Sequence, residues 1–143
     1  MTPFKDLLAL AVNRKGSLKA VKAELPGVAD AELLRSRDDA FYFSALTRRI
    51  FRAGLKHSLV DNKWPAFEEA FFGFDPEKLV LMPDTMLDDR MQDTRLIRHW
   101  GKMKAIRHNA QLVLDLAEEY GSVGNWLADW PVDDTVGMWW LLK

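Results

Sequence analysis

The sequence predicts an all-α fold, a compact multi-helix domain that spans residues 1–143. Apolar residues recur at helical spacing along almost the whole chain, and the alternating pattern typical of strands is nearly absent. Hydrophobic residues make up 48% of the sequence, with six Trp and eight Phe, which supplies enough apolar area for one buried core. The chain has no internal repeat, low-complexity segment or linker. We therefore expect a single domain.

The first two expected helices are short and carry narrow apolar stripes. Their members are Phe4, Leu7, Leu8 and Ala11 in the first, and Leu18, Val21 and Leu25 in the second. Pro26-Gly27 should end the second helix, because Pro and Gly both interrupt helical structure. A further short helix is expected after Asp30.

A long helix is expected next, with Asp38 or Asp39 as its N-cap. Its buried stripe is predicted to contain Phe43, Leu46, Ile50, Ala53 and Gly54, the small residues allowing close approach of another helix. The following helix should begin at Trp64-Pro65, after Asn62 or Lys63, because Pro suits the first helical turn. It should end near Gly73.

The second half of the chain contains four more helix signals. Asp75-Pro76-Glu77 is a start signal, and another short helix should begin at Asp84 or Thr85. A long amphipathic helix ending by Gly121 is indicated by the spacing of Met103, Ile106, Ala110, Val113, Leu114 and Ala117. Ser122 can cap a helix that bears Trp126 and Trp130 and that Pro131 stops.

The C-terminal segment, residues 136–143, has the most apolar helix-like pattern of the chain. Natural domains rarely leave such a patch uncovered. Either this helix packs against the core, or the chain is the N-terminal portion of a longer protein, which is the reading we favour. A subunit interface is the third reading, with self-association through Trp139, Trp140, Leu141 and Leu142.

Composition excludes several classes of function. The chain has no Cys, which excludes disulfides, thiol catalysis and Cys-ligated zinc and fits a reducing, cytoplasmic location. No apolar stretch approaches the length of a membrane span, and Asp6 interrupts the N-terminal apolar run, so we expect neither a membrane partner nor a signal peptide. The three His residues lack the carboxylate spacing of a zinc site. We expect no metal and no cofactor.

Charge is segregated locally, although the formal net charge is only −1. Residues 40–60 contain no acidic residue and include Arg48, Arg49, Arg52, Lys56 and His57. A second basic cluster lies between residues 95 and 108, and its candidates for contacts to a DNA backbone are Arg98, Lys102, Lys104 and Arg107. Such segments can neutralise phosphates and bind duplex DNA in a salt-dependent way. A solvated helix face is the alternative interpretation.

Several phrases between Arg48 and Asn109 occur together in the order found in one known family. They are Ala53-Gly54-Leu55, Phe74-Asp75-Pro76, Ile97-Arg98-His99, then Lys102, Ala105 and Asn109-Ala110. On these residues a little under half of the chain resembles the DNA-3-methyladenine glycosylase I family of the helix-hairpin-helix glycosylases. The resemblance implies a DNA repair enzyme that binds damaged double-stranded DNA, flips an alkylated base out and hydrolyses its N-glycosidic bond.

The resemblance also implies a base pocket. Family members place an acidic residue four positions before Ala-Gly-Leu and an aromatic residue two positions after it, and these positions are Arg49 and His57 here. Arg49 cannot accept the hydrogen bonds that a carboxylate accepts, so either the pocket is rebuilt or the substrate differs. Trp64, Tyr42 and Phe51 could stack on a base, with core packing as the alternative for each.

Catalytic residues are not assigned by the sequence. The family's DNA-gripping hairpin follows the matched phrases, whereas the turn-like segment Leu25-Pro26-Gly27-Val28-Ala29 precedes them, so we interpret this segment as a helix terminator. The family's Cys/His zinc clasp cannot form in a chain without Cys. The alternative function is therefore a catalytically inactive helical module that binds DNA or a protein.

Overall fold

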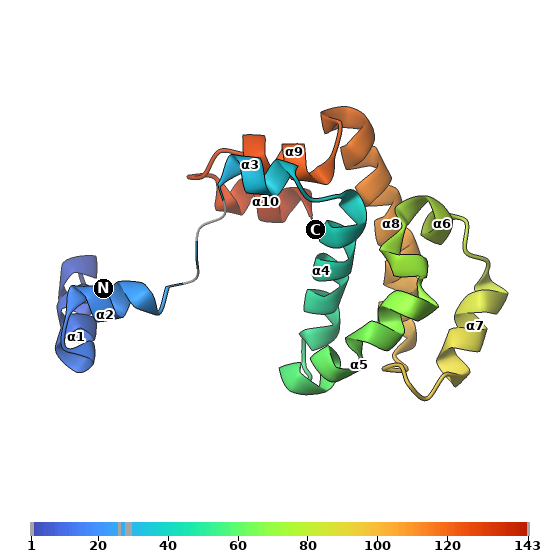
Figure 1. The fold of residues 1–143 in the computed structure, drawn as a ribbon, viewed down its shortest axis with the longest axis horizontal. Helices are drawn as coiled ribbons and strands as arrows, with labels where there is room; N and C mark the ends of the chain where they lie inside the picture. Colours follow the sequence, from blue (N-terminus) through green and yellow to red (C-terminus); the bar gives the residue numbers. More distant parts are fainter. Residues whose placement is uncertain (1, 26, 28–29, 143) are drawn as a thin grey trace.

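The protein is described by a computed structural model that covers residues 2–25, 27 and 30–142, and these residues form helices and no strand (Figure 1). The elements are α1 (Phe4–Lys15), α2 (Leu18–Ala23), α3 (Ala31–Arg35), α4 (Asp39–Arg52), α5 (His57–Ala70), the 3-10 helix η1 (Phe72–Phe74), α6 (Pro76–Val80), α7 (Asp84–Gln92), α8 (Trp100–Tyr120), α9 (Val123–Asp129) and α10 (Thr135–Leu141). The predicted all-α fold is confirmed. None of the helices in this described part combines the length and hydropathy that a membrane span requires.

Most helices begin at the capping side chains that the sequence offers. Among the described residues, seven such side chains accept a hydrogen bond from the backbone N–H three residues later, namely Ser17, Asp30, Asp38, Asp75, His99, Ser122 and Asp134. Each bond satisfies a backbone donor that has no partner within the helix. The predicted starts of α3, α4, α6, α7 and α9 are confirmed, as is the long helix α8 that ends before Gly121.

The start predicted for the helix after α4 is wrong. α5 begins at His57, and Pro65 lies inside it rather than in its first turn. Pro65 removes one backbone donor from the helix. The longer helix nevertheless buries Val60 and Trp64 as well as Phe67. Helical stability in proteins comes mainly from such packing, which here outweighs the local preference of Pro.

An aromatic cluster forms the centre of the core between α4, α5 and η1. The Trp64 ring stacks on Phe67 and Phe74, with ring centroids 4.9 and 5.4 Å away. Phe51 of α4 meets Phe67 edge-on, with centroids 4.7 Å apart. All four of these side chains are buried. The core continues along α8 through Met103, Ile106, Ala110, Val113 and Leu116.

The turn between α5 and α6 has an unusual backbone. Phe72, Gly73 and Phe74 have φ angles of 54°, 64° and 60°, all in the left-handed region. This conformation is costly for residues with a Cβ atom. Phe74 is fully buried and packs edge-on against Phe43 as well as on Trp64. The buried ring therefore holds the strained turn in place.

The buried side of α4 differs from the predicted stripe. Tyr42, Phe43, Thr47 and Phe51 are buried, because α5, α8, α9 and η1 all contact this helix. Leu46 and Ile50 are 39% and 36% exposed, and Ala53 and Gly54 lie in the exposed turn after the helix. Only Phe43 of the predicted stripe is buried, so the prediction is wrong for the other members.

α1 and α2 pack on each other and lie apart from the other helices in Figure 1. The two predicted helices are present, but their described residues include no buried side chain, and Phe4 is 76% exposed. α2 ends at Ala23. Pro26, Val28 and Ala29 lie outside the described residues, and so does the turn that the sequence predicts there.

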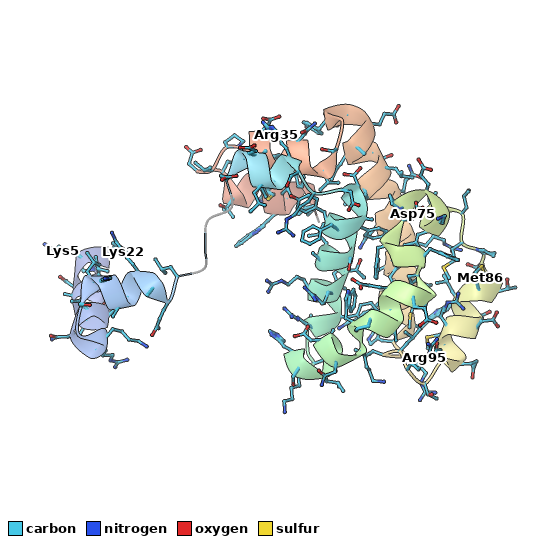
Figure 2. All side chains as sticks on the ribbon, in the orientation of Figure 1. Lys5, Lys22, Arg35, Asp75, Met86 and Arg95 are labelled. Atoms are coloured by element: carbon cyan, nitrogen blue, oxygen red, sulfur yellow. The ribbon has the colours of Figure 1, made fainter. Side chains whose placement is uncertain are left out.

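The C-terminal segment forms a helix, α10, that is only partly packed. Met138 and Leu142 pack against the core, whereas Trp139 and Trp140 are each 67% exposed. α3, which carries Arg35 (Figure 2), packs on α9. Gly124 of α9 lies directly against the backbone of Leu34 in α3.

Candidate functional site

A cavity of about 250 Å³ lies between α4 and α8. Its apolar wall contains Phe43, Leu46, Ile50, Leu112, Val113 and Leu142. Its polar groups are Thr47, Arg49 and Asn109. The two residues that the sequence wrongly places in the core, Leu46 and Ile50, therefore form the edge of this cavity. Such a mismatch between local pattern and burial is common at functional sites.

Thr47 is the polar group most deeply placed in this cavity. The residue is 2% exposed, and its Oγ1 atom has no hydrogen-bond partner. A buried hydroxyl without a partner costs about 1–3 kcal/mol, a cost that a bound molecule able to form a hydrogen bond with it would remove. The hydroxyl of Thr47 is therefore a candidate ligand contact that the sequence did not reveal.

Arg49 and Asn109 approach the cavity from opposite helices, α4 and α8. Arg49 is exposed and Asn109 is half-buried. The residues that line the cavity include no Asp or Glu. The guanidinium group only donates hydrogen bonds, whereas the amide of Asn109 both donates and accepts.

A larger cavity, of about 590 Å³, lies between α1 and α2. It is lined mainly by the aliphatic side chains of this helix pair, among them Leu7, Leu10 and Leu25, with Arg14, Lys15 and Glu24 at its rim. The ion pair between Lys15 and Glu24 neutralises part of that rim. No buried unpaired polar side chain is recorded there among the described residues. We therefore place the candidate site between α4 and α8.

The four predicted base-pocket residues are not brought together. Arg49 lines the cavity, but His57 is exposed at the start of α5. The Tyr42 hydroxyl donates to the Leu34 carbonyl at 2.6 Å, and burial raises the pKa of Tyr42. The Trp64 indole donates to Ser44 Oγ at 2.9 Å and is 3% exposed.

Two of the predicted DNA contacts are engaged inside the protein. The Lys102 ammonium donates to the carbonyl oxygens of Phe51 and Ala53, at 3.2 and 2.6 Å. It thereby satisfies carbonyl groups at the C-terminal end of α4, where a cation is favourable. Arg107 donates to the Met82 carbonyl at 3.0 Å and pairs with Asp84 at 2.6 Å.

Some basic side chains of the two clusters are not engaged with carbonyl or carboxylate oxygens of the protein. Arg98 and Lys104 are exposed, and the Lys104 ammonium lies 5.5 Å from the centre of the Trp100 ring. Arg52 pairs with Asp61, and this hydrogen bond lowers the pKa of the Asp61 carboxyl. Within the described part of the chain, the Lys and Arg side chains of residues 40–60 and 95–108 that make no ion pair or carbonyl contact are Arg48, Arg49, Lys56, Arg98 and Lys104.

The helical fold matches solved structures of one class of protein, the DNA glycosylases. 3-Methyladenine DNA glycosylase I from Staphylococcus aureus aligns with a TM-score of 0.60 and 33% identity over 63% of this chain and 48% of that chain. A structure of 3-methyladenine DNA glycosylase I in complex with 3-methyladenine aligns equally well, with a TM-score of 0.60 and the same coverage. Residues 31–137 match the methyladenine glycosylase family, and the chain belongs to that family.

Two curated relatives also match part of the chain. DNA-3-methyladenine glycosylase of Haemophilus influenzae is 41% identical over 63 residues, which is 44% of this chain and 34% of the relative. DNA-3-methyladenine glycosylase 1 of Escherichia coli is 34% identical over 67 residues, which is 47% of this chain and 36% of the relative. The chain thus spans about a third of the length of these relatives.

Proposed function

We propose that this chain is the helical body of a DNA repair glycosylase, which removes an alkylated base from duplex DNA by hydrolysing its N-glycosidic bond. The observation that carries the proposal is the family match over residues 31–137, which contains almost the whole cavity between α4 and α8. The names of the relatives support it, since they are 3-methyladenine glycosylases and one is in complex with that base.

The cavity between α4 and α8 is the proposed site for the flipped base. A glycosylase must hold the base between apolar faces while polar groups contact its edge. Leu46 and Ile50 would contact the ring, and the unpaired hydroxyl of Thr47 would gain a partner. This arrangement supports binding of the base. We assign no catalytic residue among the described side chains.

A larger side chain that fills the cavity should slow removal of the alkylated base. Ile50→Trp places a large ring in the cavity from a side chain that is already 36% exposed, so the helix should tolerate it. We expect release of methylated bases from alkylated DNA to fall by at least about ten-fold. The measurement is the amount of free base released over time.

Leu59→Trp is the matched control, because Leu59 is 45% exposed on α5 and does not line the cavity. It should leave the release rate unchanged. If the Ile50→Trp protein released methylated bases as fast as the unsubstituted chain, the cavity would be excluded as the base site. Salt-sensitive DNA binding by the unsubstituted chain without any release would instead favour the alternative, a catalytically inactive DNA-binding module.

Damaged duplex DNA is the proposed partner, held by contacts to its phosphates rather than by sequence readout. Arg98 and Lys104 are our leading candidates among the four predicted residues, because Lys102 and Arg107 are engaged with carbonyl oxygens. Arg98→Ala with Lys104→Ala should weaken DNA binding about equally for all sequences. The slope of log affinity against log salt should flatten by roughly one unit per lost contact.

Lys78→Ala is the control for this double substitution, since Lys78 is an exposed lysine of α6 that pairs with Asp75. It should leave the slope as it is. A slope that is unchanged in the Arg98→Ala, Lys104→Ala protein would assign these two residues to an ordinary solvated helix face.

Self-association through the C-terminal tail is a separate proposal. Trp139 and Trp140 are largely exposed, and a second copy of the chain could bury both indoles. Leu141 is 43% exposed on the same helix, whereas Leu142 already packs against the core. The mass of the protein in solution, measured over a range of concentrations, addresses this proposal directly.

A further inference from the structure

We infer that the cavity between α4 and α8 selects an alkylated base whose edge carries a carbonyl oxygen, as alkylated guanine does, over alkylated adenine, and that Arg49 determines this selectivity. The inference rests on the proposed function, because it names the substrate class of the same cavity. It concerns which base is bound and not how the bond is broken.

The hydrogen-bonding groups of the cavity carry the argument. Arg49 presents up to five N–H donors and no acceptor. The lining residues include no carboxylate that could accept a hydrogen bond from an exocyclic amino group. Guanine presents two acceptors, O6 and N7, on one edge, and a guanidinium group can bind both. Adenine presents an amino group in place of O6, which leaves one donor of Arg49 facing another donor.

Arg49 is available for this contact. Its neighbour on the helix, Arg52, is held by Asp61, and Arg95 is held by Asp93 and Glu69. Among the described residues, no ion pair or hydrogen bond of the Arg49 side chain is recorded. Its donors therefore face the cavity or solvent, and a ligand that accepts from them displaces only water.

The other two polar groups do not distinguish the bases. The hydroxyl of Thr47 and the amide of Asn109 can each donate or accept, so each can serve either base. A purine alkylated at the ring nitrogen N3 carries positive charge in DNA, which the guanidinium group repels in both cases. A carbonyl oxygen placed between the two charges offsets this repulsion, whereas an amino group does not. The bias therefore comes from Arg49.

The test compares two free bases methylated at the same ring nitrogen, 3-methylguanine and 3-methyladenine. Binding is followed by the methyl NMR signals of Ile50 and Leu112, which line the cavity. We expect 3-methylguanine to bind about ten-fold more tightly. Arg49→Gln should remove most of this preference, because an amide both donates and accepts. Arg49→Glu should reverse it, because a carboxylate only accepts.

Arg48→Glu is the matched control, with the same change of charge one residue away. Arg48 lines a different hollow, beside Ser44 and Glu68, and does not reach this cavity. This substitution should keep the preference for 3-methylguanine. Since Arg48 and Arg49 are not in the buried core, thermal unfolding should be similar for all these proteins.

Two negative results are distinguishable. If both bases shift the methyl signals but bind equally, or if 3-methyladenine binds more tightly and Arg49→Gln has no effect, the inference is overturned while the cavity remains a base site. If neither base shifts these signals in the unsubstituted chain, the cavity is not the base site, and the proposed function of the cavity fails together with the inference.

Discussion

Trp64→Ala should lower the free energy of unfolding by about 3–5 kcal/mol, the range for removing a large aromatic side chain from a packed core. Trp64 is 3% exposed, stacks on Phe67 and Phe74, and donates a hydrogen bond to Ser44. The substitution would leave a cavity at the centre of the aromatic cluster and would remove the hydrogen bond from the indole to Ser44 Oγ, which keeps only its bond to Glu68. Urea unfolding followed by circular dichroism would measure the loss.

Trp139→Ala is the matched control, because it removes the same side chain from a site that is 67% exposed. The free energy of unfolding of this protein should differ from that of the unsubstituted chain by no more than about 0.5 kcal/mol. The pair also tests the sequence-based interpretation of Trp64 as a stacking partner for a flipped base. A Trp64→Ala protein of unchanged stability that no longer bound a base would support that interpretation and contradict the core assignment.

Gly124→Ala should also destabilise the protein, by about 1–3 kcal/mol, which is typical of a side chain forced into a packed interface. A Cβ atom at this position would lie 2.4 Å from the carbonyl oxygen of Leu34 and 3.3 Å from Cα of Arg35. Both are backbone atoms, so no side-chain rotation can relieve the overlap. α3 and α9 would have to separate, which would disturb the ion pair between Arg35 and Asp129.

Gly101→Ala is the control, and we expect it to change the stability of the protein in the opposite direction or not at all. Gly101 lies in the first turn of α8, and a Cβ atom there would approach nothing closer than 3.4 Å, the distance to the His99 ring. Ala favours a helix over Gly by up to about 1 kcal/mol, so this protein should be unchanged or more stable. Equal effects of the two substitutions on the midpoint of thermal unfolding would contradict the close contact between α3 and α9.

Local signals in the sequence predicted most of the fold. Capping residues such as Asp38 and Ser122 act through neighbouring backbone groups, so their effect is visible within a few residues. The start of α5 was predicted wrongly at Trp64-Pro65 because it depends on contacts between distant parts of the chain. The seven residues that α5 adds before Trp64-Pro65 include Val60, whose burial depends on the partners that surround it in the fold. A preference for Pro in the first turn does not contain that information.

The candidate site was less predictable than the fold. Counting from Ala53-Gly54-Leu55 led to Arg49, which does line the cavity. The sequence did not indicate Thr47 as a site residue, because a buried hydroxyl without a partner is recognised only when its surroundings in the fold are known. The contacts that some basic side chains make inside the protein were hidden for the same reason. Lys102 and Arg107 bind backbone carbonyl oxygens, and every residue carries such an oxygen, so the sequence cannot mark those partners.

The turn from Phe72 to Phe74 has a consequence for how this sequence can diverge. Phe74 must reach the aromatic cluster, and Asp75, the next residue, must cap α6. An inserted or deleted residue would move one of these two side chains out of place, and either loss would be costly. A substitution at Phe72, which is 39% exposed, removes neither of these two side chains. The length of this turn is therefore tightly constrained, unlike that of an ordinary surface loop, and so are its second and third residues, the left-handed Gly73 and the buried Phe74.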